Sequence, residues 1–582
     1  MAHHLSLVKF ERRCQYHREM SASTPRLTIR NAILVLSCVA LVLPVCFSLF
    51  TSLLPDGHDT LEYLPRMVEF HRNIAEEILF PRWAPDLVRG AGEPLFEFNP
   101  PMIYYLAELW HLVGFDFITA LNLACVVLVI ASAFGMFLLA RLYFGPWGAW
   151  LATAAYLYAP YFAVNLYVRG ALAEFAAFPF YAFALYGFGA YAQMRERRFL
   201  LVGTLAYAGI LFSHNAAALF FTPLLLAFFL LTAWTEKSWN VLANQVFGWL
   251  LGLGLGACVW IPSLAERQFV GLDRLLKGSL RYSNHFVSPH LLLNSPWIGG
   301  TSDLSQKIGI SFSLGWSHLV LLMLVFAFAL KFRKFAHWRW LAFFSAALVM
   351  LCFMMTPYAA GIWDHVTLLQ YVQFPWRLLG PAALCLALLI APLGQILKSL
   401  PRWRPLLFGV ALALLIVPNF AHNFPRRYRH ELLSEWAPQR LSARGVEATT
   451  AFEYVPRWVI AWPIPFQGVR IITGSAQAKQ TGRAVTSWSG DVNAATPVTA
   501  ELFITWFPGW MVLVDGHRVP SAPAELTGLI RFDIPPGTHQ VEAIWKRTAP
   551  RWIGDSVSWL SLLTLAVMFL VHWRKPQPTR PA

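Results

Sequence analysis

The sequence ILVLSCVALVLPVCFSLFTSLLPDGHDTLE, from Ile33 to Glu62, joins a long apolar run directly to a polar and acidic one. About 20 mostly apolar residues are enough to cross a bilayer as a helix. The preceding residues are polar and basic, and the apolar run is too long for the core of a cleaved signal peptide. We therefore expect Ile33–Leu54 to stay in the protein as its first membrane span.

The composition extends this interpretation to the whole chain. Of the 582 residues, 57% are hydrophobic and only 13% are charged, about half the charged fraction of a soluble domain. We predict a polytopic all-α membrane protein with about twelve transmembrane helices. The expected spans are 32–54, 117–140, 148–166, 171–193, 199–213, 216–234, 241–263, 311–330, 338–357, 378–397, 405–420 and 553–573.

The distribution of charge predicts the orientation in the membrane. The formal net charge is +15, but Lys and Arg that flank apolar segments mark cytoplasmic loops, so we expect no nucleic-acid partner. The first outer loop, 55–116, reverses the pattern, with eleven acidic side chains against four Arg. With an even number of spans, the tails 1–30 and 574–582 are both cytoplasmic, and the long loops lie on the outer face among the lipid headgroups.

The chain divides into a long apolar part and a polar part near the C-terminus. Residues 31–420 are expected to form the transmembrane domain, whereas 421–552 is polar and its last part alternates as strands do. Asp515-Gly516 is typical of a hairpin, and Pro535-Pro536-Gly537 of another turn. We predict an extracytoplasmic β-sandwich, followed by the last span, 553–573. Its tryptophans suit either stacking on sugars or, the interpretation we favour, the core: Trp506, Trp510 and Trp545.

The acidic stretch after the first span has two compatible interpretations. Apolar residues recur at near-helical spacing from Leu64 to Ile78, which predicts an amphipathic helix lying on the outer membrane surface. Asp59, followed three residues later by Glu62, then fits the capping box of that helix. Alternatively, the same carboxylate faces a cavity. Asp56 and His58 stand in the same stretch.

Other polar groups occur at the outer ends of later spans. The segment Pro81–Leu106 is rich in Pro, Gly and aromatic residues, and such backbone at the membrane edge must be satisfied by protein or by a water-filled cavity. Ionisable residues at this depth are functional candidates, although arginines also snorkel to headgroups and a histidine is often simply buried. The candidates lie in YVRGALAEF, LFSHNAAAL and LLQYVQFPWRLLG, and they are Arg169, Glu174, His214, Gln373, Trp376 and Arg377.

A carboxylate and several arginines at one outer cavity suit sugar transfer from a lipid phosphate. Arginine binds phosphate oxygens in a bidentate manner and offsets the charge of the leaving group. An aspartate can deprotonate the acceptor hydroxyl or hold a divalent cation. The same charges would also suit a transport pathway. The metal ligands stay unassigned, because no second His follows closely in HDTLEYL.

Several stretches resemble a known family. GHDTLEYLPRMVEFHRN, LFPRWAPDLVRGAGEPLFEFNPPMIYYL, YVRGALAEF, QFPWR and FPGWMVLVDGHRV are similar to bacterial integral membrane proteins labelled "6-pyruvoyl-tetrahydropterin synthase-related". The chain also resembles YfhO-like proteins and the wider GT-C glycosyltransferase superfamily, over roughly residues 30–573. Nothing in it resembles the soluble pterin enzyme, which needs a cluster of His ligands.

This resemblance implies roles for the candidates. GT-C enzymes use lipid-phosphate-linked sugars and an essential acidic residue in the first outer loop, which would be Asp59, with Asp56 as the alternative. Glu174 would be its acidic partner. Arg377 and Arg169, to which we add His214, would contact the donor phosphate. We assign four further residues to the substrate cavity: His58, Glu62, Gln373 and Trp376.

The sequence thus predicts a GT-C-like glycosyltransferase of the bacterial inner membrane. It would move a sugar from a polyprenyl-phosphate donor to an envelope glycan, lipid or protein, and a divalent cation is the one cofactor left open. A glycolipid transporter or flippase is an alternative, for which we would expect inverted repeats and find none. A non-catalytic assembly factor that binds partners through segment 421–552 is another.

Overall fold

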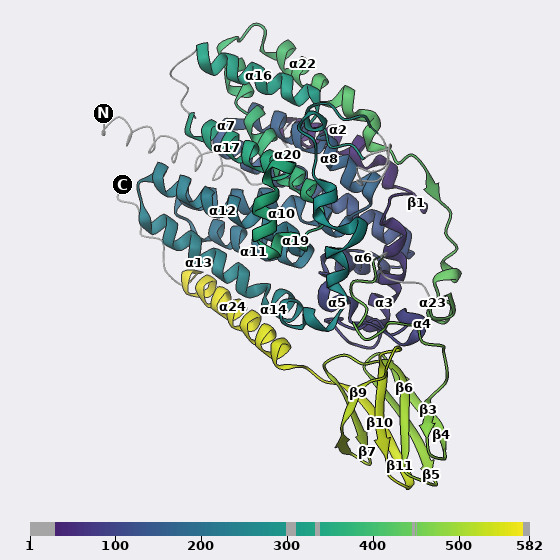
Figure 1. Ribbon diagram of the computed structural model, residues 1–582. Coiled ribbons are helices and arrows are strands. Elements are labelled where there is room, and N and C mark those ends of the chain that lie inside the picture. The colour runs from purple at the N-terminus through teal and green to yellow at the C-terminus, as the bar shows by residue number, and fades with distance from the viewer. Residues whose placement is uncertain (1–28, 298–309, 332–337, 445–448, 450, 574–582) are drawn as a thin grey trace.

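The apolar segments fold into helices and the C-terminal polar segment into strands. The computed structural model describes residues 29–297, 310–331, 338–444, 449 and 451–573. Figure 1 shows a large helical part with a β-sandwich at one end, and the helices of the first outer loop lie between the two. The tail 574–582 and nearly all of the tail 1–30 lie outside the described residues.

Several helices are long and apolar enough to cross a membrane. Within the described ranges, five are long and apolar enough to cross a membrane: Phe117–Leu157, Leu172–Met194, Asn215–Glu236, Pro375–Ser399 and Arg404–Asn423. Two bent pairs raise the number to seven if each is one span: Trp239–Leu255 with Ala257–Phe269, and Trp338–Met354 with Pro357–His365. Helices also form at the predicted segments near 199–213 and 311–330, as α11 (Arg197–Ser213) and α16 (Trp316–Lys331). The larger count of about twelve stays a prediction.

The second and third predicted spans meet at a glycine. Element α7 (Phe117–Leu157) contains two helices joined at Gly145, whose φ of 70° breaks the helical backbone just before Pro146. The second helix ends near Leu157, earlier than the predicted residue 166. The chain then continues through α8 (Pro160–Ala163) and a single π-helical turn, Val164–Arg169.

Much of the first outer loop is buried. It contains α3 (Tyr63–Ala75), α4 (Leu87–Gly90), α5 (Leu95–Phe98) and α6 (Met102–Leu112). The prediction that α3 lies on the membrane surface is wrong, because Arg66 and Glu69 are buried together with Leu64 and Phe70. The capping-box interpretation is also wrong, since the Asp59 side chain makes no capping hydrogen bond. The carboxylate of Asp59 therefore does not cap the helix.

The β-rich part is a sandwich of two antiparallel sheets. One sheet has the order β3-β6-β10-β9 and the other β4-β5-β11-β7-β8. The strands are β3 (Val469–Thr473), β4 (Ala476–Ala484), β5 (Ser487–Ala494), β6 (Val498–Thr505), β7 (Trp510–Val514), β8 (His517–Val519), β9 (Ser521–Pro523), β10 (Leu529–Ile534) and β11 (Gly537–Trp545). The described residues of 421–468 contain one short strand, β2 (Tyr428–Arg429), which pairs with β1 (Leu54–Pro55).

Two sequence predictions about the sandwich are confirmed. Asp515 and Gly516 have φ values of 50° and 77° and link β7 to β8 as a two-residue hairpin, with Val514 opposite His517. Trp510 is buried in the core of the sandwich, as favoured, and Trp545 and Trp506 are partly buried and pack against that core. Trp83 of the first outer loop packs against the rings of Trp510 and Trp545, at centroid distances of 5.5 and 4.8 Å. The loop and the sandwich therefore share one core.

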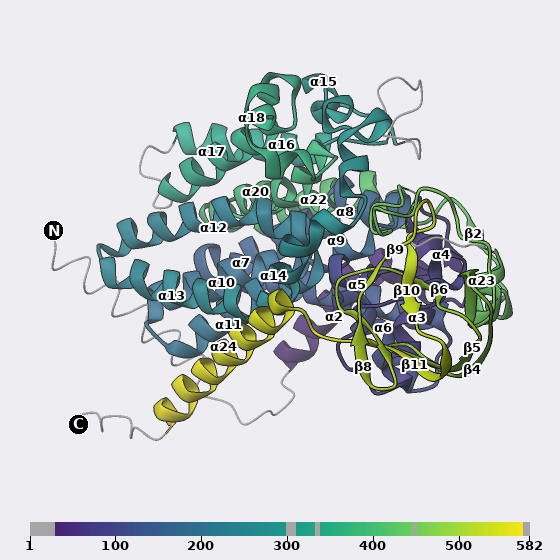
Figure 2. The ribbon, with the colours of Figure 1, turned by 60° about the horizontal axis from the view of Figure 1, so that its bottom comes forward.

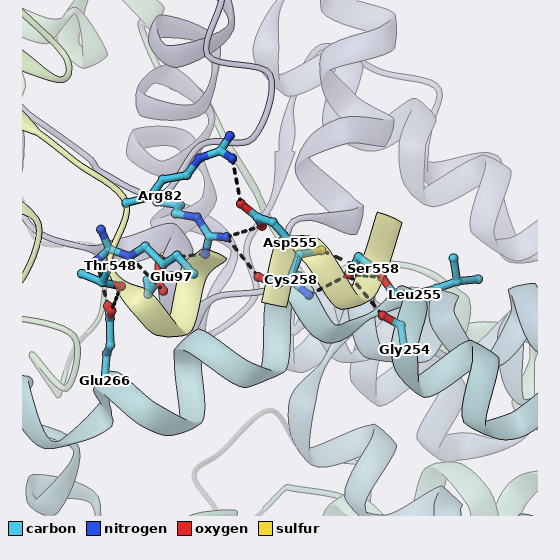
Figure 3. Close-up of polar contacts among 11 residues, drawn as sticks. Arg82, Glu97, Gly254, Leu255, Cys258, Glu266, Thr548, Asp555 and Ser558 are labelled. Atoms are coloured by element: carbon cyan, nitrogen blue, oxygen red, sulfur yellow. Dashed lines mark hydrogen bonds and ion pairs between the residues drawn. The ribbon is translucent and has the colours of Figure 1, made fainter. Parts of the chain in front are cut away.

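A buried ion-pair network fastens the last helix, α24 (Ala549–Trp573), to the helical part (Figure 3). Arg551 is fully buried and contacts Glu266 at the end of α14 (Ala257–Glu266) across 2.7 Å and Glu97 of α5 across 3.4 Å. Arg82 links the same Glu97, at 2.9 Å, to Asp555 of α24, at 3.2 Å. Figures 1 and 2 show α24 leading from the sandwich along α14 and α13 (Trp239–Leu255). The network fixes the sandwich in place over the first outer loop.

Candidate functional site

Backbone contacts bring the start of the first outer loop against the π-helical turn. The N–H of His58 donates to the carbonyl oxygen of Val168 across 3.0 Å, and the N–H of Asp59 donates to that of Arg169 across 2.8 Å. Gly170 adopts a left-handed φ of 63°, and a Cβ there would lie 2.1 Å from Oγ1 of Thr60. Only glycine allows the two segments to approach this closely.

The π-helical turn and the next helix build an ion-pair cluster around one carboxylate. Glu174, on α9 (Leu172–Ala176), contacts Nη1 of Arg169 at 2.8 Å and Nε of Arg377 at 3.2 Å. Two neutral donors complete its surroundings: the Tyr161 hydroxyl at 2.7 Å and the Asn165 amide at 2.9 Å. A buried carboxylate with four donors of this kind is held in one position.

The two arginines of this cluster are held from other sides as well. The Arg169 guanidinium lies over the ring of Trp376, 4.5 Å from its centroid, a favourable cation–π arrangement. Arg377 donates through Nη1 to the carbonyl oxygen of Val372 across 2.8 Å. Arg377 is the more open of the two, with 16% of its side chain exposed against 4% for Arg169. Its Nη2 has no hydrogen-bond partner among the described residues.

The cluster carries an excess of positive charge, and Asp59 lies within electrostatic range of it. Two guanidinium groups stand against the single carboxylate of Glu174. Asp59 lies near enough for its negative charge to act on both Arg169 and Arg377. Asp59 is only half-buried, and its carboxylate accepts no hydrogen bond from any residue that the structure describes. The arrangement places a carboxylate that can act as a base next to a positively charged site that can bind an anion.

His214 borders the same cluster. It precedes α12 (Asn215–Glu236), and its Nδ1 accepts a hydrogen bond from the backbone N–H of Ala217 across 3.2 Å. Burial, followed by the positive charges of Arg377 and Arg169, lowers the pKa of His214 to about 3. The imidazole is therefore neutral at physiological pH, and it can contribute a hydrogen bond to a ligand but not a charge.

Other predicted site residues lie elsewhere or have other partners. Asp56 pairs with Arg429, with Oδ1 and Nε 2.5 Å apart, next to the short β1–β2 pairing. Glu62 pairs with Arg66 at 2.5 Å. His58 is exposed at the turn beside Asp59. Gln373 has a φ of 65° and turns the chain towards Pro375, but its side chain makes no hydrogen bond with the Glu174 cluster.

The cluster also contains residues that the sequence analysis did not select. Tyr161 and Asn165 both donate to Glu174. Asn165 lies on the same π-helical turn as Arg169, and Tyr161 on the preceding α8. A polar Asn in an otherwise apolar run was the available signal for one of them. The structure holds no group of three or more His, Cys, Asp or Glu side chains, among the residues it describes, that is arranged to hold a metal ion.

One family model matches part of this chain. Residues 99–264 match the family PMT_2, described as dolichyl-phosphate-mannose-protein mannosyltransferase. The matched range includes Arg169, Glu174 and His214 but not Asp59 or Arg377, and it is well under half of the chain. The match supports a membrane glycosyltransferase of the GT-C type. A search of curated proteins gives no match.

Solved structures of one enzyme also resemble this chain. The arabinofuranosyltransferase AftD from Mycobacteria is 17% identical, over 72% of this chain and 27% of that one, with a TM-score of 0.40. A mutant form of AftD is 16% identical, over 70% of this chain and 29% of that one, with a TM-score of 0.37. The alignments thus cover less than a third of the AftD chain.

Proposed function

We propose that the protein transfers a sugar from a polyprenyl-phosphate carrier to an envelope acceptor on the outer face of the bacterial inner membrane. The observation that carries the proposal is the free carboxylate of Asp59 beside the arginine pair that Glu174 holds. Arg169 and Arg377 supply the charge that a phosphate needs, and Asp59 supplies a base. The family matched by residues 99–264 is named for sugar transfer from a lipid phosphate.

In the proposed reaction, the donor phosphate contacts Arg377 first, because this side chain is the more exposed and its Nη2 is available. The acceptor hydroxyl attacks the anomeric carbon as the bond from that carbon to the phosphate oxygen breaks. Asp59 takes the hydroxyl proton, and the released polyprenyl phosphate keeps the electron pair of the broken bond. The two guanidinium groups stabilise the charge that develops on the leaving phosphate.

A divalent cation does not fit the donors at this site. Mg²⁺ and similar ions prefer several carboxylate or carbonyl oxygens. Here one free carboxylate stands beside two guanidinium groups, and Glu174 is already engaged by both of them. We therefore assign the stabilisation of the charge on the leaving phosphate to Arg169 and Arg377 rather than to a metal ion.

The test uses the purified full-length protein in lipid nanodiscs. It is incubated with a panel of radiolabelled polyprenyl-phosphate sugars and with a bacterial envelope extract as the acceptor. We expect labelled acceptor and free polyprenyl phosphate in equal amounts, and neither product from Asp59→Asn. Failure to release the carrier from any donor would overturn the proposal. In sealed proteoliposomes, movement of the intact labelled donor across the bilayer would instead indicate the transporter.

A further inference from the structure

A polar pocket lies at one edge of the β-sandwich, away from the Glu174 cluster. It has a volume of about 590 Å³, within the range of pockets that hold small ligands. Strands β3 and β4 are edge strands of the two sheets, and the pocket is lined by β4 and by the residues that lead into β3. The structure thus leaves a hollow where the two sheets end side by side.

Aromatic rings form one wall of this edge pocket. Phe466 and Phe503 meet edge to face with their centroids 5.1 Å apart. Phe503 is buried in a small apolar cluster that includes Val88 and Ala91 of the first outer loop. Phe466 is half-buried and borders the pocket. Phe503 is therefore supported from behind by the first outer loop, and Phe466 packs against it.

Amide side chains also line the edge pocket. Trp488 donates through Nε1 to Oε1 of Gln480 across 3.2 Å, which fixes the orientation of that amide. The Nε2 of Gln480 then has no hydrogen-bond partner among the described residues and borders the pocket. Gln467 is exposed at the pocket rim. One oriented amide, a second amide and aromatic rings in the same pocket suit a ligand with both C–H faces and hydroxyl groups.

The charge of the lining excludes other ligand classes. No carboxylate lines the pocket, which argues against a cation. Its one charged group, Arg483, donates through Nη2 to the carbonyl oxygen of Gly90 across 2.5 Å. The guanidinium is thereby directed to the first outer loop, and a single engaged arginine does not suit a polyanion. A neutral, hydroxyl-rich ligand fits best.

We propose that the edge pocket binds a sugar unit of a neutral glycan, one chain of which is the acceptor; this assignment rests on the proposed function. One face of the sugar ring packs against Phe466, and its hydroxyls bond to the amides of Gln480 and Gln467. Arg483 and Phe503 tie the pocket to the first outer loop, whose start carries Asp59. A glycan seated here is held by the same loop that builds the transfer site.

The first experiment measures glycan binding by the full-length protein in nanodiscs. An array of neutral oligosaccharides, including mannan, arabinan and galactan fragments, is screened first, and the affinity for the best binder is measured by titration calorimetry. Replacing Gln480 or Gln467 by Ala removes one hydrogen bond, so we expect each variant to bind about fivefold more weakly. Phe466→Ala should weaken binding at least as much.

The chain offers a matched control. Gln477 lies on the same strand, β4, is exposed, and is not part of the pocket lining. Gln477→Ala should bind like the unaltered protein, and the unfolding temperature of each variant shows whether it has folded. The proposal is overturned if no neutral oligosaccharide binds, if acidic ones bind better, or if the pocket variants bind like Gln477→Ala.

The outcome separates this inference from the proposed function. Asp59→Asn should bind the glycan normally, because the residue is not part of the pocket. Glycan binding without transfer by the unaltered protein would remove the enzymatic proposal and leave the pocket assignment in place. If the pocket variants transfer sugar and bind glycan like the unaltered protein, the pocket assignment falls and the enzymatic proposal stands.

Discussion

The backbone N–H of Asp59 donates to the carbonyl oxygen of Arg169 across 2.8 Å, although several helices separate the two residues in the sequence. This bond sets the aspartate beside a guanidinium that Glu174 already holds at 2.8 Å. The backbone of Asp59 is thus held in place, and its carboxylate oxygens stay available. General base catalysis needs a carboxylate that can accept a proton within reach of the reacting group.

Asp59→Asn should abolish sugar transfer without unfolding the protein. General base catalysis contributes about 100-fold or more, and the amide of Asn cannot accept the proton. Asp56→Asn is the matched control, because Asp56 pairs with Arg429 rather than with the cluster. We expect it to keep most of the activity. The measurement is the release of polyprenyl phosphate, and similar activity in the two variants would refute the assignment.

Glu174→Gln should destabilise the protein, in contrast to Asp59→Asn. Glu174 compensates two nearly buried guanidinium groups, and removing one partner of a buried ion pair costs about 3–5 kcal/mol. Thermal unfolding in detergent, followed by tryptophan fluorescence, measures the difference. An unchanged unfolding temperature for Glu174→Gln would show that the cluster is open to water and that its charges are screened.

Arg377→Lys should raise the KM for the lipid-phosphate donor more than it lowers kcat. Lysine keeps the charge, but its single nitrogen lacks the planar fork through which Arg377 bonds to the Val372 carbonyl with Nη1 and presents Nη2 to phosphate. We expect a rise in KM of about tenfold, equivalent to one lost charge-assisted hydrogen bond. Steady-state kinetics with varied donor separate the two constants. An unchanged KM would place the phosphate elsewhere.

The sequence predicted the parts of the site but not how they join. Arg169, Glu174 and Arg377 stood out because ionisable residues are costly at the ends of apolar segments. Arg169 and Arg377 both contact the carboxylate of Glu174. This arrangement depends on the π-helical turn and on the close approach of Gly170 to Thr60. Neither feature has a period that can be recognised in one sequence.

Short sequence patterns predicted the structure correctly where it depends only on neighbouring residues. Asp515-Gly516 formed the expected hairpin, since the two-residue turn is determined by residues that tolerate positive φ. The helix at Tyr63–Ala75 formed, but its polar face was misinterpreted as facing lipid headgroups. Arg66 and Glu69 are buried there because other segments of the first outer loop, including α6 and Asp86, pack against the helix, and a helical period cannot show what packs against each face.

Glu93→Gln should stabilise the protein at high pH. Burial, followed by the negative charge of Glu453, raises the pKa of Glu93 from 4.5 to about 8, and its Oε1 has no hydrogen-bond partner among the described residues. Between these two values the folded protein binds more protons than the unfolded chain, so stability falls as the pH rises. The loss is complete above about pH 8.

The glutamine keeps the shape of Glu93 and does not titrate. At pH 9 its unfolding temperature should exceed that of the unaltered protein, whereas near pH 4.5 the two should converge. The exposed Glu525→Gln serves as the control and should follow the unaltered protein throughout. Parallel curves for Glu93→Gln and the unaltered protein would show that Glu93 is ionised in the folded state.

Arg551→Met should loosen the attachment of the sandwich. Arg551 is fully buried between Glu266 at 2.7 Å and Glu97 at 3.4 Å. Its removal leaves the buried Glu266 without its arginine partner and Glu97 with only its Arg82 ion pair, at a cost of about 3–5 kcal/mol. The exposed pair of Arg440 with Glu435 gives the control, because an Arg440→Ala change there should cost less than about 1 kcal/mol. Thermal unfolding compares the two, and limited proteolysis after Lys546 reports whether the sandwich separates first. Equal unfolding temperatures for the two variants would mean that the network in Figure 3 does not fasten the last helix.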